Sequence, residues 1–560
     1  MENTVKKRLQ LLFPPFYRLY GNDEDDASHN VYPLGIGYLA ATVRKHTDWE
    51  VQAVVGDAKF EDSVYFNMPL IRMAGSGFDN YLACLRTPDA PIWKEMEQHL
   101  EEFAPDVLGL SATSQNWKAA TMVAAIAKRL NPDILIVAGG PHSSMAGEKV
   151  LECPDIDINV VGEGEETILD ILRAIDEGRD FSTVDGISYR DDGGQVKKNK
   201  PRAFVGEVDD IPFPAEAAPY VLKDYEKFPS EAFRSMFSIR ACPYNCQFCG
   251  SRTIWGRTSR FRSPENVVAE MKFLRGMGIN HIHFEDDLFG IKPKYIKDLC
   301  GLIEKELPDV TWSGELTVTT ISDQNLAAMK ASGCIAISYG VESGNNEMLK
   351  IIRKTQDVDG IRRSAALLRK HDIRSSAFFM IGFPEETEET LNDTIELMKE
   401  LDVDNIVFSI FTPYPDTEMF HICKKKGLIP DDYDISLYNH QSLENCFTDQ
   451  IPPDRFRQIA TESLELVDKL NQEKMKTFAE REKLKALDGM TEDAGQGRAA
   501  LVRELIGAFV RSMKNDGLTE TTRKVVKYIK HKEGEEIIPN PEVVTNVTGP
   551  TYYKQPPSSN

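Results

Sequence analysis

The stretch RACPYNCQFCGSR, residues 240–252, decides the fold, because it places Cys242, Cys246 and Cys249 on one loop directly after a β-rich run. Three thiolates with the spacing C-x3-C-x2-C can bind three irons of a four-iron cluster. The missing fourth cysteine leaves one iron open to an outside ligand, and an open iron implies chemistry. The alternative is a structural zinc site, but zinc takes four closed ligands and no further Cys or His follows until His281. The spacing therefore favours the iron–sulfur cluster.

Outward from this loop, strand and helix patterns alternate from about residue 236 to about residue 430. Strand and crossover-helix units in this order predict parallel strands in an open or closed α/β barrel, with the chemistry where the strands end. We therefore expect a barrel over residues 233–435. The six predicted strands are SMFSIR, HIHFE, VTWSGEL, AISYGVE, SSAFFMIG and NIVFSIF.

A similar alternation precedes the barrel, over residues 1–180. It predicts βαβ units on a parallel sheet, and so a doubly wound, Rossmann-like domain. The predicted strands are LQLLF, WEVQAVV, VLGLSAT, ILIVAGG and INVVGEG, and the predicted helices include 34–46, 146–151 and 166–175.

Three further segments complete the predicted organisation. Residues 181–232 are rich in proline and glycine, which break regular structure, so we expect a linker there. Residues 436–540 are predicted to be mainly helical, since apolar residues recur every four positions from Leu501 to Met513. Residues 541–560 are expected to be a loose tail.

Length and composition bound the class of protein. A length of 560 residues predicts about three or four domains of roughly 150 residues each. A formal charge of −22 disfavours nucleic acid as a partner, because it repels phosphate. Nine unevenly spaced cysteines do not form a disulfide framework, which indicates a reducing cytoplasm. No apolar run approaches the ~20 residues that span a bilayer, and the run Leu11–Phe13 is too short for a signal peptide.

The cysteine loop after the first barrel strand resembles that of the radical S-adenosylmethionine enzymes. The resemblance implies a partial (β/α)6 barrel in which Cys242, Cys246 and Cys249 hold a 4Fe–4S cluster. In that family the open iron binds S-adenosylmethionine and delivers an electron that cleaves it to a 5′-deoxyadenosyl radical. Phe248 matches the aromatic residue that the family places beside the adenine. The resemblance also implies an electron donor such as flavodoxin or ferredoxin.

The later strand ends resemble the family's S-adenosylmethionine contacts. FEDDLFG at 284–290 resembles the segment that binds the methionine ammonium, but the usual Gly-Gly-Glu is absent, so which carboxylate acts stays open. FTPYPDTEMF at 411–420 resembles the sixth-strand motif, with Asp416 in place of glycine. Each motif alone has a structural alternative, such as a carboxylate at a helix start or a solvated strand end. The implied contacts are Glu285, Asp286 and Asp287 for the ammonium, Glu342 with Lys354 for the ribose, and Gly382 against adenine.

Glycines and small hydroxyl residues at the strand ends of residues 1–180 leave room for a large ligand at the carboxyl edge of the sheet. The dinucleotide fingerprint G-x-G-x-x-G is absent, and an ordinary packing domain is the alternative. From PLG through GGPH to V-x-G-E-G-E, the pattern resembles the cobalamin-binding domain fused to many radical S-adenosylmethionine enzymes. The D-x-H-x-x-G motif is missing, so we expect no histidine on cobalt. The implied cobalamin contacts are Pro33, Leu34, Gly35, Ser111, Thr113, Gly139, Gly140, Pro141, His142, Gly162, Glu163, Gly164 and Glu165.

Together the two resemblances imply a cobalamin-dependent radical methyltransferase that methylates an unactivated carbon of a small-molecule or peptide substrate. A cyclase or oxidoreductase with the same cofactors is the main alternative. A methylthiotransferase fits less well, because only Cys84 and Cys153 precede the three cluster cysteines. A non-catalytic cobalamin carrier or sensor would not need the intact cysteine loop.

Overall fold

The computed structural model describes residues 6–21, 29–60 and 68–492. Residues up to Asp468 form one compact unit, and a second unit begins at Lys469. The helix predicted around Leu501 to Met513 and the tail at 541–560 lie outside the described residues. The helical C-terminal region begins later than expected: residues 438–452 form turns and irregular structure, and the long helix α17 spans Pro453–Glu492.

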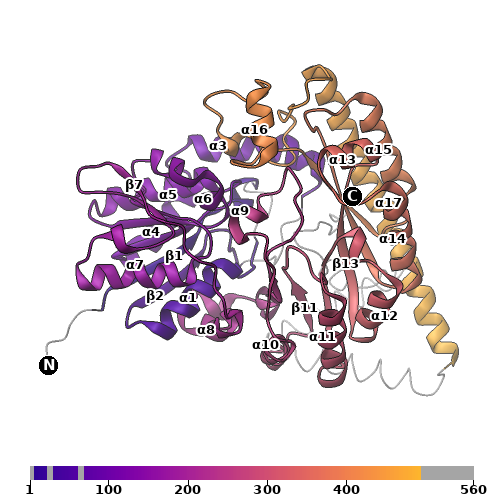
Figure 1. Ribbon diagram of the computed structural model, residues 1–560, viewed down its shortest axis with the longest axis horizontal. Coiled ribbons are helices and arrows are strands. Elements are labelled where there is room, and N and C mark those ends of the chain that lie inside the picture. The colour runs from indigo at the N-terminus through magenta and orange to yellow at the C-terminus, as the bar shows by residue number, and fades with distance from the viewer. Residues whose placement is uncertain (1–5, 22–28, 61–67, 493–560) are drawn as a thin grey trace, which may run out of the picture. The chain divides into compact units, whose positions relative to one another are not determined.

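The N-terminal half of the first unit is a seven-stranded sheet covered by helices (Figure 1, indigo to magenta). Its strand order is β2-β1-β3-β4-β5-β6-β7, and the first five strands are parallel, which confirms the doubly wound domain. The strands are β1 (Arg8–Phe13), β2 (Glu50–Val55), β3 (Val107–Ser111), β4 (Leu135–Gly139), β5 (Ile158–Val160), β6 (Ile187–Arg190) and β7 (Val196–Lys198). The helices are α1 (Leu34–His46), α2 (Leu70–Arg72), α3 (Phe78–Arg86), α4 (Pro91–Phe103), α5 (Trp117–Leu130), α6 (Pro141–Ala146), α7 (Glu165–Glu177) and α8 (Pro214–Val221).

The segment 181–232 is more regular than its prolines and glycines indicate. Strands β6 and β7 form an antiparallel hairpin that extends the N-terminal sheet beyond β5. Helix α8 packs on α1, where Gly37 lies so close to Pro214 that a Cβ would come within 2.9 Å of the proline Cβ. The expectation of irregular structure is wrong for these elements, because the glycines serve the hairpin turn and the prolines the helix start.

The helix expected at 146–151 is also placed differently. The chain forms α6 at Pro141–Ala146 and then a 3-10 helix at Gly147–Glu152. Proline at the first helical position starts α6 early, because its fixed φ suits a helix start. Gly147 has a positive φ of 59° and breaks the helix there.

The second half of the unit is a six-stranded parallel sheet in the order β15-β14-β13-β12-β11-β8, which confirms the partial (β/α)6 barrel (Figure 1). The first predicted strand is split, because Ile239–Arg240 leaves the sheet and pairs antiparallel with β10. The strands are β8 (Ser235–Met236), β9 (Ile239–Arg240), β10 (Arg260–Phe261), β11 (His281–Phe284), β12 (Thr311–Leu316), β13 (Cys334–Glu342), β14 (Arg374–Ile381) and β15 (Asn405–Ile410). The helices are α9 (Ser251–Trp255), α10 (Pro264–Gly276), α11 (Pro293–Glu306), α12 (Asp323–Ala331), α13 (Asn346–Ile351), α14 (Val358–Lys370), α15 (Glu388–Glu400) and α16 (Glu418–Lys425).

The inner face of the barrel is polar. His283 lies opposite Ser313 in the β11–β12 register, and its Nδ1 is 2.9 Å from the Ser313 Oγ. Because alternate strand residues share a face, Glu285 and Glu315 continue these two columns at the carboxyl ends. Glu315 in turn lies opposite Ser338 of β13. The topology thus gathers carboxylates at one rim, as expected for an active site of this fold.

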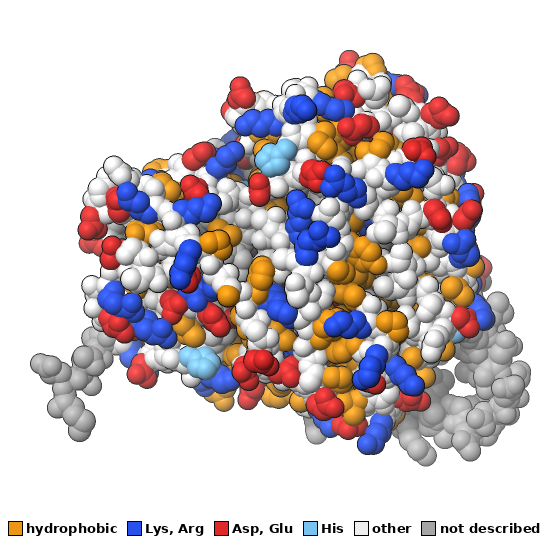
Figure 2. All heavy atoms as spheres, in the orientation of Figure 1, with side chains coloured by type: hydrophobic (Ala, Val, Ile, Leu, Met, Phe, Trp, Pro, Cys, Tyr) orange, Lys and Arg blue, Asp and Glu red, His pale blue; other side chains and the backbone are white. Residues whose placement is uncertain are grey.

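In the described residues no helix is long and apolar enough to cross a membrane. All nine cysteines are free of disulfides. Positive and negative side chains are interspersed over the face in Figure 2, rather than segregated by sign.

Candidate active site

The cysteine loop runs from Cys242 to Cys249 between β9 and α9, at the carboxyl rim of the barrel. Two backbone hydrogen bonds of Gln247 hold the loop to neighbouring segments. Its N–H donates to the Ile352 carbonyl (3.1 Å), and its carbonyl accepts from the Met419 N–H (3.0 Å). Ala241, just before the loop, has a φ of 84°, a conformation that a non-glycine residue rarely adopts. Such strain occurs at functional sites that the surrounding structure holds in place.

The three thiols sit close enough to influence one another. Burial raises the pKa of Cys242 and of Cys249 to about 11, and neighbouring thiols add to the rise. Iron binding at these thiols would therefore release protons, since the thiolate is the ligand. Among the described residues no three His, Cys, Asp or Glu side chains are grouped to hold one metal ion. Three thiols on one loop fit a four-iron cluster, because there each thiolate would bind its own iron.

The three acids of FEDDLFG have separate surroundings. Asp286 is fully buried and accepts bonds from the backbone N–H groups of Ser238 (2.7 Å) and Ile239 (2.9 Å), so it holds the turn before β9. Glu285 accepts from the Ser235 hydroxyl at 2.9 Å. Asp287 accepts from the Ser251 hydroxyl at 2.5 Å and raises the pKa of both Cys242 and Cys249. Asp287 is thus the carboxylate that faces the cysteine loop.

Glu315, at the end of β12, is an acid that the sequence analysis missed. Burial raises its pKa to about 8, with further rises from Glu285 and Asp287 and an opposing effect from Lys354. Its position at a barrel strand end, in the run VTWSGEL, was the available signal. The rim therefore holds more carboxyl groups than one ammonium group would need, and Glu315 is mostly protonated at neutral pH.

Glu342 and Lys354 form a buried ion pair beside the cysteine loop, with 2.6 Å between the carboxylate Oε1 and the lysine Nζ. Burial lowers the pKa of Lys354, but Glu342 and Cys246 outweigh that effect and the net direction is upward. Gly340 makes room for the pair, because a Cβ there would lie 2.3 Å from the Glu342 Oε1 and 2.5 Å from the Lys354 Nζ. Glu342 itself has a φ of 66°, which turns the chain at the end of β13.

The expected adenine contacts lie together. The ring of Phe248, between the last two cysteines, is 5.8 Å from the ring of Phe383, which follows Gly382. Gly382 has a φ of 95°, and a Cβ there would lie 2.8 Å from Phe456 of α17. Its N–H donates to the buried carboxylate of Glu386, whose pKa burial raises to about 7. The requirement for glycine at 382 thus comes from the fold, whatever ligand lies nearby.

The expected cobalamin contacts all lie at the carboxyl ends of β3, β4 and β5 or at the starts of α1, α6 and α7. Gly140 has a φ of 98°, and a Cβ there would lie 2.9 Å from the Ala112 carbonyl, so these loops meet closely. His142 is buried, stacks on Trp117 with 4.6 Å between ring centroids, and lies 3.1 Å from the Ser114 hydroxyl. Burial lowers the pKa of His142 to about 4, so its ring is neutral.

The cysteine loop lies directly against this edge of the N-terminal sheet. Helix α9, which follows the loop, contacts α6. Gly250, next to Cys249, is so close to Met145 of α6 that a Cβ would lie 2.3 Å from the methionine sulfur. Gly162, after β5, approaches the Ile254 carbonyl, 3.7 Å from the position of its missing Cβ. The structure therefore brings the two groups of expected cofactor contacts together.

Two family models match the chain in the same order as the two halves of the fold. The B12 binding domain matches residues 67–172, and the radical SAM superfamily matches residues 236–398. The chain is 32% identical to the uncharacterized methyltransferase PH0819 of Pyrococcus horikoshii over 405 residues, which cover 71% of this chain and 79% of that protein.

The chain belongs to the cobalamin-binding radical S-adenosylmethionine enzymes. The fold agrees with this membership: the structure of the radical S-adenosylmethionine methyltransferase TsrM from Kitasatospora setae, with cobalamin and a 4Fe–4S cluster bound, superposes with a TM-score of 0.61. That match covers 83% of this chain and 89% of TsrM at 16% identity. The anaerobic magnesium-protoporphyrin IX monomethyl ester cyclase of Rubrivivax gelatinosus is 28% identical, covering 62% of each chain. The radical S-adenosylmethionine enzyme family therefore includes relatives named for two reactions.

Proposed function

We propose that this radical S-adenosylmethionine enzyme is a methyltransferase that methylates an unactivated carbon of a small-molecule or peptide substrate. The observation that carries the proposal is the close contact of Gly250 and α9 with Met145 and α6, which sets the cysteine loop against the cobalamin edge. A substrate at this junction would lie between both cofactors. When bound, these groups supply a 5′-deoxyadenosyl radical on one side and a transferable methyl group on the other.

The stoichiometry of the proposed methyl transfer shows which reactants the enzyme needs. One substrate C–H, two S-adenosylmethionine molecules and two electrons give the methylated product, S-adenosylhomocysteine, methionine and 5′-deoxyadenosine. The electrons require a donor such as flavodoxin or ferredoxin. We also propose a cytoplasmic location, because nine free cysteines suit a reducing compartment.

The chain's own residues position the reactants. Cys242, Cys246 and Cys249 would hold the cluster, and Asp287 would accept hydrogen bonds from the S-adenosylmethionine ammonium. Glu342 would bind the ribose hydroxyls with its second oxygen while Lys354 occupies the first. Asp286 would take no part, since the turn at Ser238 and Ile239 already uses its carboxylate.

A cyclase or oxidoreductase with the same cofactors is the second candidate, favoured by the similarity to the Rubrivivax cyclase. The test is anaerobic reconstitution with iron, sulfide and cobalamin, followed by reaction with S-adenosylmethionine and a chemical reductant. Both candidates produce 5′-deoxyadenosine, and only the methyltransferase produces S-adenosylhomocysteine in step with it. A protein that bound cobalamin yet formed neither product would be a carrier, and the proposal would be wrong. Cys246→Ala is the control that should form no 5′-deoxyadenosine.

A further inference from the structure

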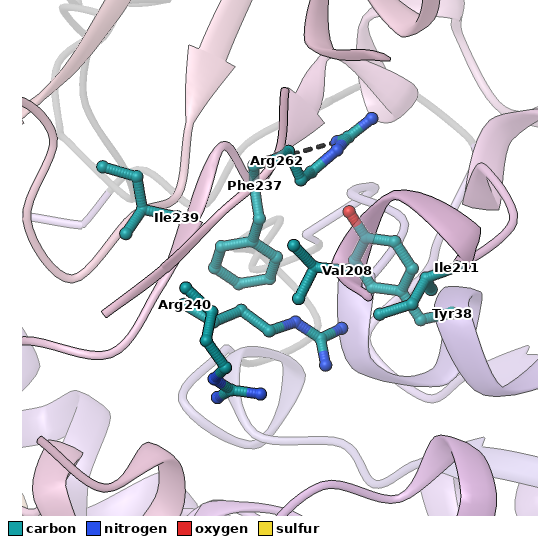
Figure 3. Close-up of a pocket in the computed structure, with 8 residues that line it drawn as sticks. Tyr38, Val208, Ile211, Phe237, Ile239, Arg240 and Arg262 are labelled. Atoms are coloured by element: carbon teal, nitrogen blue, oxygen red, sulfur yellow. Dashed lines mark hydrogen bonds between the residues drawn. The ribbon is translucent and has the colours of Figure 1, made fainter. Parts of the chain in front are cut away.

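A cluster of arginines lies where the N-terminal half meets the barrel (Figure 3). Arg240, Arg260 and Arg262 line a cavity of about 10 Å³, at the lower limit for one water molecule, together with Tyr38 of α1 and Phe237. Figure 3 shows the Phe237 ring beside Arg240 and the bond from Arg262 to the Phe237 carbonyl. All three arginines belong to the barrel half, close in sequence to the cysteine loop.

The carboxylates that meet two of these arginines come from the other half. Arg240 donates to Glu163 at 2.8 Å and to Glu165 at 2.5 Å. Arg260 donates to both oxygens of Glu163, at 2.8 and 2.7 Å. Glu163 also accepts from the Val205 N–H at 2.7 Å, so both of its oxygens are used.

This network is almost fully removed from water. The side chains of Arg240 and Glu163 are 6% and 3% exposed, and those of Glu165 and Arg260 are 10% and 13% exposed. Burial raises the pKa of Glu165, but the charge of Arg240 outweighs it and the net direction is downward, so the carboxylate stays charged. Charges buried to this degree are stable only when they stay paired.

The network connects the two cofactor regions directly. Arg240 lies two residues before Cys242, and Arg260 is its partner in the β9–β10 pair. Glu163 and Glu165 lie between the end of β5 and the first turn of α7, at the edge where cobalamin is proposed. A shift of either half would therefore separate buried opposite charges.

We propose that Arg240 and Arg260 are positioning residues: by binding Glu163 and Glu165, they hold the cysteine loop at a set distance from the cobalamin site. The proposal rests on the proposed function, because that function places cobalamin at this edge. The ion pairs themselves do not depend on any bound group. It also gives the two glutamates of the V-x-G-E-G-E motif a different role from the cobalamin contact that the resemblance implied.

The test uses the double variant Glu163→Gln/Glu165→Gln, which keeps the shape of both side chains and removes their charge. The matched control is Glu270→Gln, because the buried Arg262–Glu270 pair has the same chemistry but lies wholly within the barrel half. Hydrogen exchange of the cofactor-free chain is measured at residues 158–166 and 240–250. We expect exchange at least tenfold faster in both segments of the double variant, and in neither segment of the control.

In the loaded protein, pulsed paramagnetic resonance measures the distance between cobalt(II) and the reduced cluster. We expect a broader distance distribution in the double variant, with cobalamin affinity within twofold of the parent. Arg240→Lys, which keeps the charge but cannot bind both carboxylates, should show the same broadening. If the double variant does not fold, Glu165→Gln alone serves, because Glu163 still binds Arg260.

Two results would overturn the proposal. Unchanged exchange and an unchanged distance would show that the network does not position the loop. A loss of cobalamin affinity above tenfold with an unchanged distance would make the glutamates cofactor ligands. A parent protein that bound no cobalamin would refute the proposed function, while the exchange measurement would still decide the role of the arginines.

Discussion

At the scale of single residues, the Glu342–Lys354 pair contributes both to stability and to the proposed binding of S-adenosylmethionine. Removing the carboxylate leaves the Lys354 ammonium buried and unpaired, which costs about 3 to 5 kcal/mol in similar sites. We therefore expect Glu342→Gln to lower both the unfolding free energy and the affinity for S-adenosylmethionine. A thermal melt together with titration of S-adenosylmethionine measures the two effects.

The double variant Glu342→Gln/Lys354→Met separates them, because it removes both charges. Its stability should return most of the way, while its affinity should stay roughly tenfold or more below the parent, the loss of one charged hydrogen bond. Full recovery of affinity in the double variant would remove Glu342 from the ribose site.

Glu315 makes the cofactor-free protein sensitive to pH. Its folded pKa of about 8 lies above its ordinary value of 4.5, so the folded state holds the proton more tightly than the unfolded state. Stability from this group is therefore complete at low pH and is lost as pH rises from about 5 to 8. Glu315→Gln removes the loss, so at pH 8.5 it should be more stable than the parent by over about 1.4 kcal/mol, the equivalent of one pKa unit. Denaturant unfolding at pH 5 and 8.5 measures this, and an equal difference at both pH values would contradict it.

At the scale of elements, the packing of the cysteine loop on α6 depends on a missing side chain. Gly250→Ala would place a Cβ against the Met145 sulfur, and overpacking of this kind costs about 1 to 3 kcal/mol. We expect the variant to retain less iron after reconstitution, because either the loop or the buried Met145 side chain must move to make room. Iron analysis and the charge-transfer absorption of the cluster measure the loss.

The compensating variant is Gly250→Ala/Met145→Ala, which restores the space. Its iron content should return toward that of the parent. Met145→Ala alone is the control, and it should keep its iron. Normal iron content in Gly250→Ala would mean that the loop does not depend on this contact.

At the scale of the whole molecule, we predict that cobalt receives no histidine ligand from the N-terminal half. The D-x-H-x-x-G motif is absent, and His142 is held between Trp117 and Ser114. We expect cobalamin to bind with its dimethylbenzimidazole displaced and with no axial nitrogen in its place. Paramagnetic resonance of the cobalt(II) form tests this, since superhyperfine splitting from nitrogen would contradict the prediction. His142→Gln should leave the spectrum unchanged.

The sequence by itself determined the two halves of the fold and their order. Strand runs such as VLGLSAT and AISYGVE, each followed by a helical pattern, can form only parallel βαβ units, and the structure confirms both sheets. The spacing of Cys242, Cys246 and Cys249 predicted the cluster chemistry, because a metal-binding loop is a local feature of the chain. The glycine of the family's sixth-strand motif is also a local feature. Asp416, which replaces it, has a φ of 59°, a conformation that glycine adopts without steric cost.

Only the tertiary structure decided which polar residues are free to act. The sequence gives no reason to distinguish the three adjacent acids of FEDDLFG. In the structure, Asp286 accepts hydrogen bonds from a buried turn, whereas Asp287 faces the cysteines. The sequence motif predicts Glu163 and Glu165 as ligand contacts. In the structure, both carboxylates accept hydrogen bonds from arginines about 75 to 97 residues away. Side-chain partners depend on contacts between distant segments and on burial, which periodicity and spacing do not encode. The sequence therefore identified the chemistry, and the packing of the two halves assigned the residues.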